Sequence, residues 1–532
     1  MIDELTNLLS DEALDFARRH LTKYYDTDFF PKPFEFQAIW YKWDELKKLP
    51  RKDLMVKCSP ITIPWKKARG GFRIVHQLHP LDAIVYTAMV YSVAKDIENK
   101  RREQNSEAVC SYRISLDGTG FFTKGSGFED YRSRCEYFAG EYKFVLMTDI
   151  SDFYNQIYLH RLENAISDAS NPIKGKIIES YLMSLNTKNS QGIPVGPAAS
   201  IILSEASLID VDEFISNQGF NHVRYVDDIR VFANSEYELD GLLQKLTLYL
   251  HQSHRLGLVG DKTKIIDSES FLQSELNNQY QLEKLEILDD IESSNNYSGA
   301  EYLEEDVEED VEEEDIGEKL LSAFERIKKY EHLDLGLARA ILRRGRAGKH
   351  EELIDFVLTN IRQFRPVMND IVLYLEAVTN TETINSIRKH LRDLLLETQL
   401  EDEATKEWIC WYIGNHESLS RDSILRVLFE NPTRLANIAR SVIRTKTISW
   451  VRQKKEALLS VGHWDRRAII HSAQILTKDE KEIWLKSIKQ HPSLDILDKW
   501  TIDWVLAGTP TSPNLPEPQI SWDDFDDSIP FF

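Results

Sequence analysis

Two adjacent aspartates interrupt a stretch of sequence that is otherwise typical of β-strands. In RYVDDIRVF, residues 224–232, apolar and aromatic residues flank Asp227 and Asp228. Aspartate is disfavoured in strands, and burying an unpaired carboxylate is costly. A hairpin turn favours aspartate, but Asp-Asp without glycine is a weak signal for a two-residue turn. A turn therefore accounts for only part of the pattern, and a functional role is the alternative.

A third carboxylate, Asp149, ends the apolar run YKFVLMTD at residues 142–149. An acid at the end of a buried strand can face a cleft above the sheet, although aspartate before a helix is also a common N-cap. Carboxylates from two strands would together offer the oxygen ligands that Mg²⁺ prefers, with Mn²⁺ as an alternative. Two such ions clamp the attacking and leaving oxygens of an in-line phosphoryl transfer. The three aspartates therefore predict phosphoryl-transfer chemistry.

The elements around these residues indicate an α+β fold. Residues 59–80 predict a β-hairpin with a basic turn at Gly70 and Gly71, followed by a helix that begins at Pro80. Strand-like runs at 142–149 and 221–234 are separated by segments of helical periodicity. This alternation predicts a mainly antiparallel sheet with helices packed against it.

The second half of the chain has a different character, which suggests a division into parts. Residues 301–315 hold eleven acids and no base, so we expect an acidic linker or loop over 286–316. Residues 317–506 show helical periodicity throughout and predict an all-α helical-repeat domain. Residues 507–532 are rich in proline, acids and aromatics and predict a tail. Residues 1–285 then form a first domain that contains the aspartates.

Composition and charge limit the class of protein. The chain has 532 residues and a net charge of −22, which excludes a uniformly basic nucleic-acid binder but not a local basic groove. Its four cysteines lack metal-ligand spacing, as expected for reduced thiols in the cytoplasm. It has no run of 18 apolar residues and no signal-peptide pattern at the N-terminus. We expect a cytoplasmic protein that does not enter the membrane.

Four motifs in a fixed order resemble the palm of reverse transcriptases. They are FVLMTDISDFY, QGIPVGPAAS, RYVDDIRVF and LGLVGDKTKI, and the likeness runs from about residue 69 to about residue 271. A lone Tyr-x-Asp-Asp is a weak signal, whereas the ordered set of four is specific. The resemblance implies reverse-transcriptase fingers and an antiparallel palm sheet. It also implies an RNA-directed DNA polymerase that uses deoxynucleoside triphosphates.

The resemblance assigns roles around the aspartates. Asp149 and Asp227 would be the principal metal ligands, Asp228 would assist, and the backbone carbonyl of Ile150 would complete a metal shell. Tyr154 lies where the family has its steric gate, so its ring would exclude a ribose 2′-OH. The alternative for Tyr154 is a tyrosine of the hydrophobic core.

Further residues would bind the nucleotide. Gln191 and Gly192 match the loop against the incoming nucleotide, and Lys262 matches a lysine near the triphosphate. A solvated surface lysine is the alternative for Lys262. Arg73 resembles the fingers arginine that grips the triphosphate, with Lys67 assisting, because a guanidinium binds phosphate through two hydrogen bonds.

Three features distinguish the chain from intron and retron enzymes. Val195 stands where those enzymes usually have glutamine, no basic three-helix thumb follows the palm, and a helical array is present instead. Arg113, in CSYR, resembles another recurrent arginine of bacterial members. This arrangement is similar to the abortive-infection and defence-associated reverse transcriptases of bacteria, an unknown-group class with a C-terminal helical-repeat domain. It implies antiphage DNA synthesis and a homo-oligomer.

Several alternatives stay open. Some members of this class make untemplated DNA that is covalently attached to a protein hydroxyl, whereas others copy a non-coding RNA template. A scaffold with a vestigial palm is the non-catalytic alternative. The basic segment ARAILRRGRAGKH, residues 338–350, is either a nucleic-acid contact or a solvated helix face.

Overall fold

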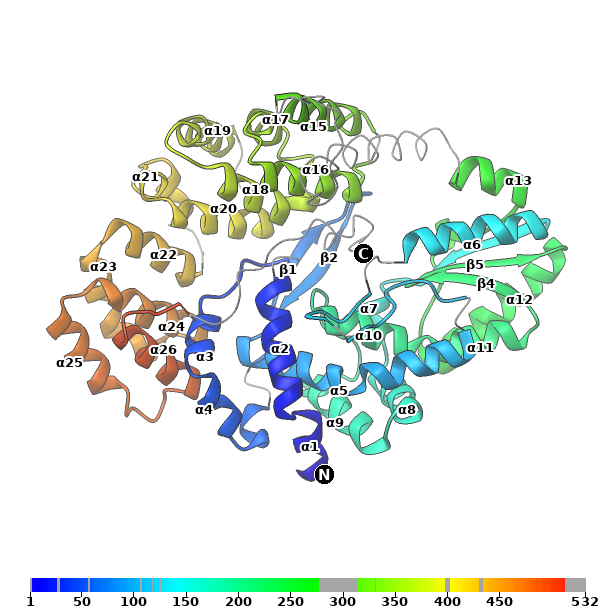
Figure 1. The fold of residues 1–532 in the computed structure, drawn as a ribbon, viewed down its shortest axis with the longest axis horizontal. Coiled ribbons are helices and arrows are strands. Elements are labelled where there is room, and N and C mark those ends of the chain that lie inside the picture. The colour runs from blue at the N-terminus through cyan, green and yellow to red at the C-terminus, as the bar shows by residue number, and fades with distance from the viewer. Residues whose placement is uncertain are drawn as a thin grey trace, which may run out of the picture.

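A computed structural model gives the fold of the chain (Figure 1). The structure describes residues 2–25, 29–55, 58–105, 108–116, 118–123, 127–276, 314–330, 332–397, 402–429 and 434–511. Most of the predicted acidic linker (286–316) and most of the predicted tail (507–532) lie outside the described residues.

The N-terminal part consists of helices followed by the predicted β-hairpin. The helices are α1 (Ile2–Leu8), α2 (Asp11–Tyr24), α3 (Glu35–Tyr41) and α4 (Trp43–Lys48). Strands β1 (Ile61–Lys66) and β2 (Phe72–Gln77) form an antiparallel pair. Gly70 and Gly71 have φ angles of 97° and 71°, and glycine adopts this left-handed region without a steric penalty. The sequence therefore predicted both the hairpin and its turn correctly.

A four-stranded antiparallel sheet forms the palm, with strand order β4-β5-β3-β6. Its strands are β3 (Phe144–Asp149), β4 (Asn221–Tyr225), β5 (Asp228–Ala233) and β6 (Lys264–Asp267). The central strand β3 is almost entirely buried, as its apolar sequence predicts. The helices that pack against this sheet include α6 (Phe128–Glu141), α12 (Glu236–Tyr249) and α13 (Ser268–Phe271). The predicted α+β fold with an antiparallel palm sheet is confirmed.

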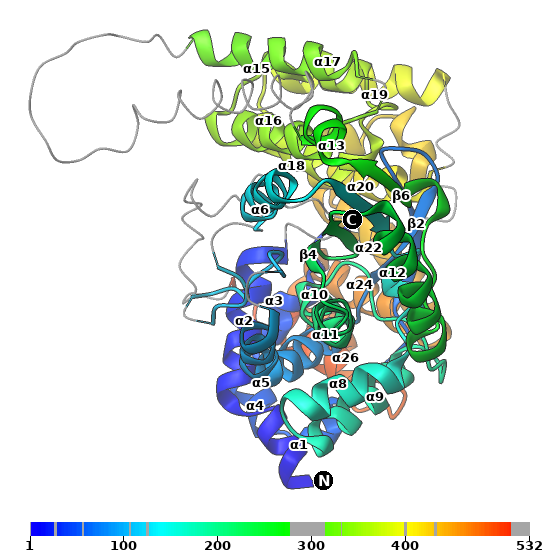
Figure 2. The same ribbon diagram turned by 90° about the vertical axis from the view of Figure 1, so that its right-hand side faces the viewer.

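Most of the remaining helices of the first half lie below the sheet and the hairpin in the views of Figures 1 and 2. The remaining helices are α5 (Pro80–Asn105), α7 (Phe153–Gln156), α8 (Leu159–Ala169), α9 (Pro172–Leu185), α10 (Ala198–Ser207) and α11 (Ile209–Asn217). The long helix α5 contacts α2, α8, α10 and α11 and so links the N-terminal helices to the palm.

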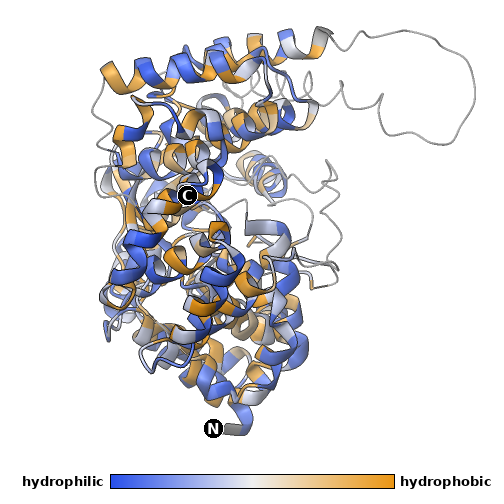
Figure 3. Ribbon diagram, turned by 90° about the vertical axis from the view of Figure 1, so that its left-hand side faces the viewer, coloured by the Kyte–Doolittle hydropathy of each residue, from blue (hydrophilic) through white to orange (hydrophobic). Residues whose placement is uncertain are grey.

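The second half of the chain is a helical array. Its helices are α15 (Glu314–Ile327), α16 (Leu335–Gly348), α17 (Leu353–Thr359), α18 (Met368–Val378), α19 (Thr383–Glu397), α20 (Glu403–Asn415), α21 (Glu417–Ser420), α22 (Leu435–Thr445), α23 (Ile448–Lys454), α24 (His463–Ser472), α25 (Lys478–Ile488) and α26 (Ile496–Leu506). Apolar and polar positions alternate around these helices (Figure 3). Aspartate side chains cap the N-termini of α16, α20 and α26.

The array curves back onto the N-terminal part of the chain (Figure 1). The Trp65 indole donates to the Pro366 carbonyl at 3.0 Å, and the Trp408 indole donates to the Phe29 carbonyl at 2.8 Å. A single hydrophobic cluster includes side chains from both halves of the chain. The array therefore covers the fingers hairpin and the N-terminal helices. Among the helices of the described residues, none combines the length and apolarity that a bilayer span requires.

Candidate active site

The fold brings the three predicted aspartates to one end of the palm sheet. Asp149 is the last residue of β3, and its Cα partner across the antiparallel ladder is Asp228, the first residue of β5. Asp227 precedes Asp228 in the turn between β4 and β5. The backbone N–H of Ile150 donates to the Asp227 carbonyl at 3.2 Å, which ties the two strand ends together. Residues 78 positions apart in sequence thus share one end of the sheet, as the motif order predicted.

The turn that carries Asp227 adopts an unusual backbone conformation. Val226 has a φ angle of 55°, and this left-handed conformation is a genuine outlier for a β-branched residue. Such strain costs about 1–3 kcal/mol and persists only where the surroundings impose it. The Val226 N–H donates to Ser111 Oγ at 3.0 Å, and its carbonyl accepts from Arg224 Nη1 at 2.8 Å. These two bonds hold the turn that presents Asp227.

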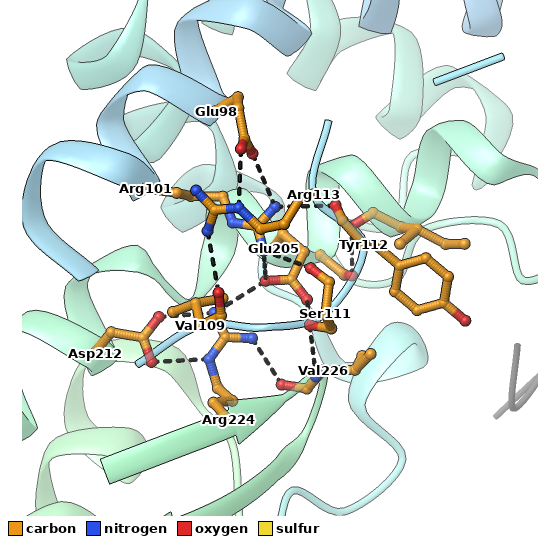
Figure 4. Close-up of polar contacts among 12 residues, drawn as sticks. Glu98, Arg101, Val109, Ser111, Tyr112, Arg113, Glu205, Asp212, Arg224 and Val226 are labelled. Atoms are coloured by element: carbon orange, nitrogen blue, oxygen red, sulfur yellow. Dashed lines mark hydrogen bonds and ion pairs between the residues drawn. The ribbon is translucent and has the colours of Figure 1, made fainter. Parts of the chain in front are cut away.

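Arg224 belongs to a buried network of ion pairs behind the turn (Figure 4). Its guanidinium donates to Asp212 at 2.8 and 2.7 Å and lies 3.0 Å from Glu205. Burial alone would raise the pKa of Asp212, but Arg224 lowers it to about 2. Burial would likewise lower the pKa of Arg224, but Asp212 and Glu205 raise it above its ordinary value. Arg224 and Asp212 are therefore held as a buried ion pair in which each charge compensates the other.

Arg113 belongs to this supporting network. Its Nε lies 2.9 Å from Glu98 Oε1, and its Nη1 donates to the Val109 carbonyl at 3.1 Å. Glu98 also pairs with Arg101, which contacts Glu205. The structure therefore places Arg113 in the network behind the turn, where its printed partners are Glu98 and Val109.

Sequence reasoning missed the supporting residues Arg224, Asp212, Glu205 and Ser111. Asp212 and Glu205 lie on helices where an acid usually indicates a solvated face, and Ser111 lies in a loop. The available signal was Arg224 itself. A charged residue inside the otherwise apolar strand HVRYV requires a buried partner.

The aspartates differ in their charge neutralisation. Lys262 Nζ lies 2.9 Å from Asp149 Oδ2, and Arg230 donates to both oxygens of Asp228 at 2.9 and 3.1 Å. Asp227 forms no ion pair with any residue that the structure describes. Burial raises the pKa of Asp227 to about 7, with repulsion from Asp149 and Asp228 contributing to the rise. Asp227 is therefore the carboxylate most in need of a counter-charge.

This arrangement fits a hard divalent cation in its donor chemistry. All three side chains offer carboxylate oxygens, which are the ligands that Mg²⁺ and Mn²⁺ take, and Asp227 lacks a cationic partner among the described residues. The carboxylate oxygens of the three aspartates do not all lie within 4.8 Å of one another, so they do not form a preassembled metal site. Within the described residues, two other sets of side chains do place their potential ligand atoms this close together. Those two sets are His160, Glu163 and Glu179, and His463, Asp495 and Asp498.

Tyr154 lies on α7, which follows the strand that carries Asp149. Its ring is buried, and its hydroxyl accepts a hydrogen bond from Ser204 Oγ at 3.1 Å. Burial raises the pKa of the Tyr154 hydroxyl well above its ordinary value, with a contribution from the nearby charge of Asp227. Tyr154 is thus packed in the core, as one interpretation of the sequence expected, and its role as a steric gate stays a prediction.

The predicted nucleotide loop packs between the palm and the hairpin. Gly192 has a φ angle of 87°, and a Cβ there would lie 3.1 Å from the Asn155 carbonyl oxygen, so the turn favours glycine. Gln191 pairs with Tyr158 in an isolated bridge beside this turn. The N–H of His76 in β2 donates to the carbonyl of Val195, the residue at the non-standard position, at 2.9 Å. The Val195 N–H donates in return to His76 Nδ1 at 3.0 Å, so the loop is tied to the fingers hairpin.

The three basic side chains that were predicted to bind the nucleotide differ in position. Arg73 is half-buried, and burial lowers its pKa to about 10; the charge of Arg339 lowers it further, whereas Asp227 and Tyr154 oppose the shift. Arg73 lies on β2, three residues before His76, which bonds to the predicted nucleotide loop through Val195. Lys67 is exposed in the hairpin turn, where its N–H donates to the Gly71 carbonyl at 3.2 Å. Lys262, on the 3₁₀ turn η4 (Gly260–Lys262), joins the site through Asp149.

Comparisons with solved structures find distant similarity to Candida telomerases. The telomerase of Candida albicans, in complex with a TWJ fragment of telomeric RNA, is 12% identical with a TM-score of 0.30, covering 74% of this chain and 70% of that one. The apo telomerase of Candida tropicalis is 13% identical with a TM-score of 0.32, covering 76% of this chain and 68% of that one. Scores this low carry no conclusion about function. No curated protein matches the chain.

A family comparison addresses the site directly. Residues 66–281 match the family described as reverse transcriptase (RNA-dependent DNA polymerase). The matched range contains β2, the palm sheet, all three aspartates and Lys262. The match and the geometry agree with the likeness inferred from the four motifs. Over residues 66–281 the chain is therefore similar to reverse transcriptases of the RNA-dependent DNA polymerase type.

Proposed function

We propose that the protein adds deoxynucleotides to a DNA strand by two-metal phosphoryl transfer. The observation that carries the proposal is the juxtaposition of Asp149 and Asp228 as direct partners across β3 and β5, with Asp227 beside them. Bound Mg²⁺ or Mn²⁺ ions would activate the attacking oxygen and stabilise the leaving pyrophosphate. Asp149 and Asp227 would hold these ions, with Asp228 and the Ile150 carbonyl in support.

The surrounding side chains have distinct tasks in this proposal. Arg73 grips the triphosphate, and Lys67 adds positive charge at the hairpin turn. Lys262, which is half-exposed and 2.9 Å from Asp149, donates a hydrogen bond or proton toward the leaving phosphate. Tyr154 excludes the ribose 2′-OH, and Gln191 and Gly192 support the base.

We further propose a role in bacterial antiphage defence. The support is architectural: helices from α15 onward form an array that returns to the fingers hairpin, where a polymerase thumb would extend beside the palm. This arrangement is similar to that of abortive-infection reverse transcriptases, which implies a cytoplasmic homo-oligomer. Within that class we favour untemplated synthesis primed by a protein hydroxyl, because the array occupies the region next to the fingers.

The nucleic acid that copurifies with the protein tests this choice. Purified protein is treated with protease or left intact, and the associated DNA is sequenced and resolved on a denaturing gel. Protein-primed, untemplated synthesis is supported if the DNA has a random or homopolymeric sequence and enters the denaturing gel at its free mobility only after protease treatment. A defined RNA together with its complementary DNA establishes templated copying instead. Protein without DNA, and with full antiphage activity after Asp227→Asn, would indicate a non-catalytic scaffold.

A further inference from the structure

Helix α16 of the array carries the basic segment that the proposed function leaves unused. Its sequence, LGLARAILRRGRAG, contains four arginines and no acid. Arg339 and Arg344 are buried, with relative exposures of 4% and 8%. Burial lowers the pKa of Arg339 to about 10, and Arg343 lowers it further, against the opposing effect of Asp370. Arg339 therefore does not lie on a solvated helix face, which was one of the two interpretations of this basic segment.

A carboxylate on the neighbouring helix orients two of these arginines. Asp370, near the start of α18, lies 3.3 Å from Arg339 Nε through one oxygen and 3.3 Å from Arg343 Nε through the other. The side-chain exposures of Asp370 and Arg339 are 6% and 4%, so bulk water screens neither group. Charges in such a position interact over longer distances than charges at the surface. The charge of Arg339 therefore acts on the elements that pack against α16.

The array holds Arg339 next to the fingers hairpin. The 3₁₀ turn η6 (Arg365–Val367) contacts both α16 and β1. The Trp65 indole of β1 donates to the Pro366 carbonyl of that turn. Trp65 is the direct cross-strand partner of Arg73 in the hairpin. The same turn therefore sets the position of α16 and, through Trp65, the position of Arg73.

Arg73 is influenced by charges from both the array and the aspartates. The charge of Arg339 lowers the pKa of Arg73, whereas Asp227 and Tyr154 act in the opposite direction. Within the described chain the Arg73 guanidinium forms no hydrogen bond or ion pair, and its Nε is buried without a partner. Trp65, the cross-strand partner of Arg73, contacts the turn η6, and η6 contacts α16, so Arg73 lies on the face of the hairpin that the array covers. Guanidinium groups from two elements on one face suit phosphate oxygens, because each can donate two hydrogen bonds to them.

We propose that Arg339 of the array and Arg73 of the fingers together form a phosphate-binding wall of the polymerase site. The ligand chemistry is a phosphate oxyanion, supplied by an incoming deoxynucleoside triphosphate or by the backbone of a DNA strand. Arg339 is a substrate-binding residue in this arrangement, and Asp370 orients it. The array is then part of the site, in addition to covering it. This inference rests on the proposed polymerase function for its substrates.

Binding measurements on full-length protein separate the two phosphate sources. A fluorescent deoxynucleoside triphosphate and a fluorescein-labelled oligothymidylate serve as probes, with Ca²⁺ in place of Mg²⁺ to prevent turnover. Arg339→Ala is expected to weaken at least one probe by about ten- to a hundredfold, because it removes a charge-assisted contact. If Arg339→Ala weakens binding of the triphosphate alone, the two arginines bind the incoming nucleotide. If Arg339→Ala weakens binding of the oligothymidylate alone, and the slope of log affinity against log salt concentration falls by about one, the two arginines bind the DNA backbone.

Two further variants distinguish a binding role from a structural one. Arg339→Lys retains the charge and is expected to recover part of the affinity. Asp370→Asn removes the opposing negative charge but keeps a side-chain oxygen that can accept from Arg339, so this variant is expected to bind the affected probe at least as tightly as the wild type. Arg346→Ala, on the same helix, is the matched control and leaves both affinities unchanged. Thermal melting of each variant reports its folding.

The proposal is overturned if Arg339→Ala and Arg339→Lys melt like wild type and bind both probes normally. It is also overturned if Asp370→Asn weakens binding as much as Arg339→Ala, since that result makes the pair a structural salt bridge. Failure of the polymerase function itself would appear differently. The wild-type protein would then bind the probes through Arg339 but incorporate no nucleotide with Mg²⁺.

Discussion

The aspartates show how a local sequence rule is broken at a candidate catalytic residue. Asp227 is held in a turn where burial and two neighbouring carboxylates raise its pKa to about 7. Lys262 and Arg230 neutralise Asp149 and Asp228 but form no ion pair with Asp227. Sequence reasoning could group the aspartates with Lys262 because each lies in a short, ordered motif. The likeness of Arg113 to a recurrent arginine gave it no role, because a motif does not show which way a side chain points.

At the same scale, Tyr154 is expected to set the preference for deoxynucleotides. Tyr154→Ala removes the ring beside the aspartates, and we expect incorporation of ribonucleotides relative to deoxynucleotides to rise about tenfold or more. The measurement is the ratio of kcat/KM for matched nucleotide pairs. Tyr154→Phe is the control, since it keeps the ring and loses only the hydroxyl and its contact to Ser204. An unchanged ratio in Tyr154→Ala would show that the tyrosine serves the core alone.

At the scale of elements, the turn between β4 and β5 depends on side chains from distant helices. Arg224 contacts Asp212, Glu205 and the Val226 carbonyl, so it links α11 and α10 to the turn that presents Asp227. The hairpin itself was predictable from its flanking strands. Its strained residue and its ion pairs were not, because they depend on contacts between segments far apart in the sequence.

We expect Arg224→Lys to destabilise this element despite conserving the charge. An ammonium cannot make the paired contacts to Asp212 and also reach the Val226 carbonyl, which leaves buried acceptors unsatisfied. The expected loss is about 3–5 kcal/mol in the free energy of unfolding, with a parallel loss of polymerase activity. Urea denaturation gives the first quantity. Arg255→Lys, at an exposed position, is the control, and equal stability of both variants would contradict this account.

Helix α2 contributes a pH dependence through His20. His20 is 7% exposed among Phe16, Tyr24 and Phe121, and burial lowers its pKa to about 3. The unfolded chain, with an ordinary histidine pKa of about 6.5, binds the proton more readily than the folded chain. The stability that His20 contributes is therefore complete above about pH 6.5 and falls by about 1.4 kcal/mol per pH unit as the pH decreases toward about 3.

His20→Phe removes this contribution. We compare urea midpoints at about pH 7.5 and about pH 5.5, one unit on either side of the ordinary histidine pKa. The difference between the two midpoints is expected to be smaller in His20→Phe than in the wild type. The exposed His251→Phe serves as the control and should behave like the wild type. A wild-type pH dependence in His20→Phe would exclude His20 as its source.

At the scale of the whole molecule, the array and the N-terminal helices form one structure. Arg467 Nε donates to Glu35 Oε1 at 3.1 Å, and both side chains are almost completely buried. The periodicity of the sequence predicted the array helices. It could not predict where they dock, because docking depends on pairs such as Trp65 with Pro366 that are hundreds of positions apart.

This buried pair tests the docking of the array. Arg467→Met leaves the Glu35 carboxylate buried without its ion-pair partner, and Glu35→Leu leaves Arg467 only the more distant Asp495 and Asp498, at 3.8 and 3.9 Å. We expect each single variant to lower the free energy of unfolding, by about 3–5 kcal/mol for Arg467→Met and by less for Glu35→Leu. The double variant replaces both partners with apolar groups and should recover much of that loss. Chemical denaturation of the four proteins measures the coupling. Strict additivity of the two losses would contradict a direct interaction between the array and α3.

The central claim is that the carboxylates of β3 and β5 catalyse nucleotide transfer. The most direct test supplies full-length protein with Mg²⁺ and labelled deoxynucleoside triphosphates and measures incorporation into acid-insoluble product. We predict incorporation by the wild type and by Asp261→Asn, an exposed acid of η4. Asp227→Asn combined with Asp228→Asn should reduce it by about three orders of magnitude or more. Equal incorporation by the double variant and the wild type would contradict the account.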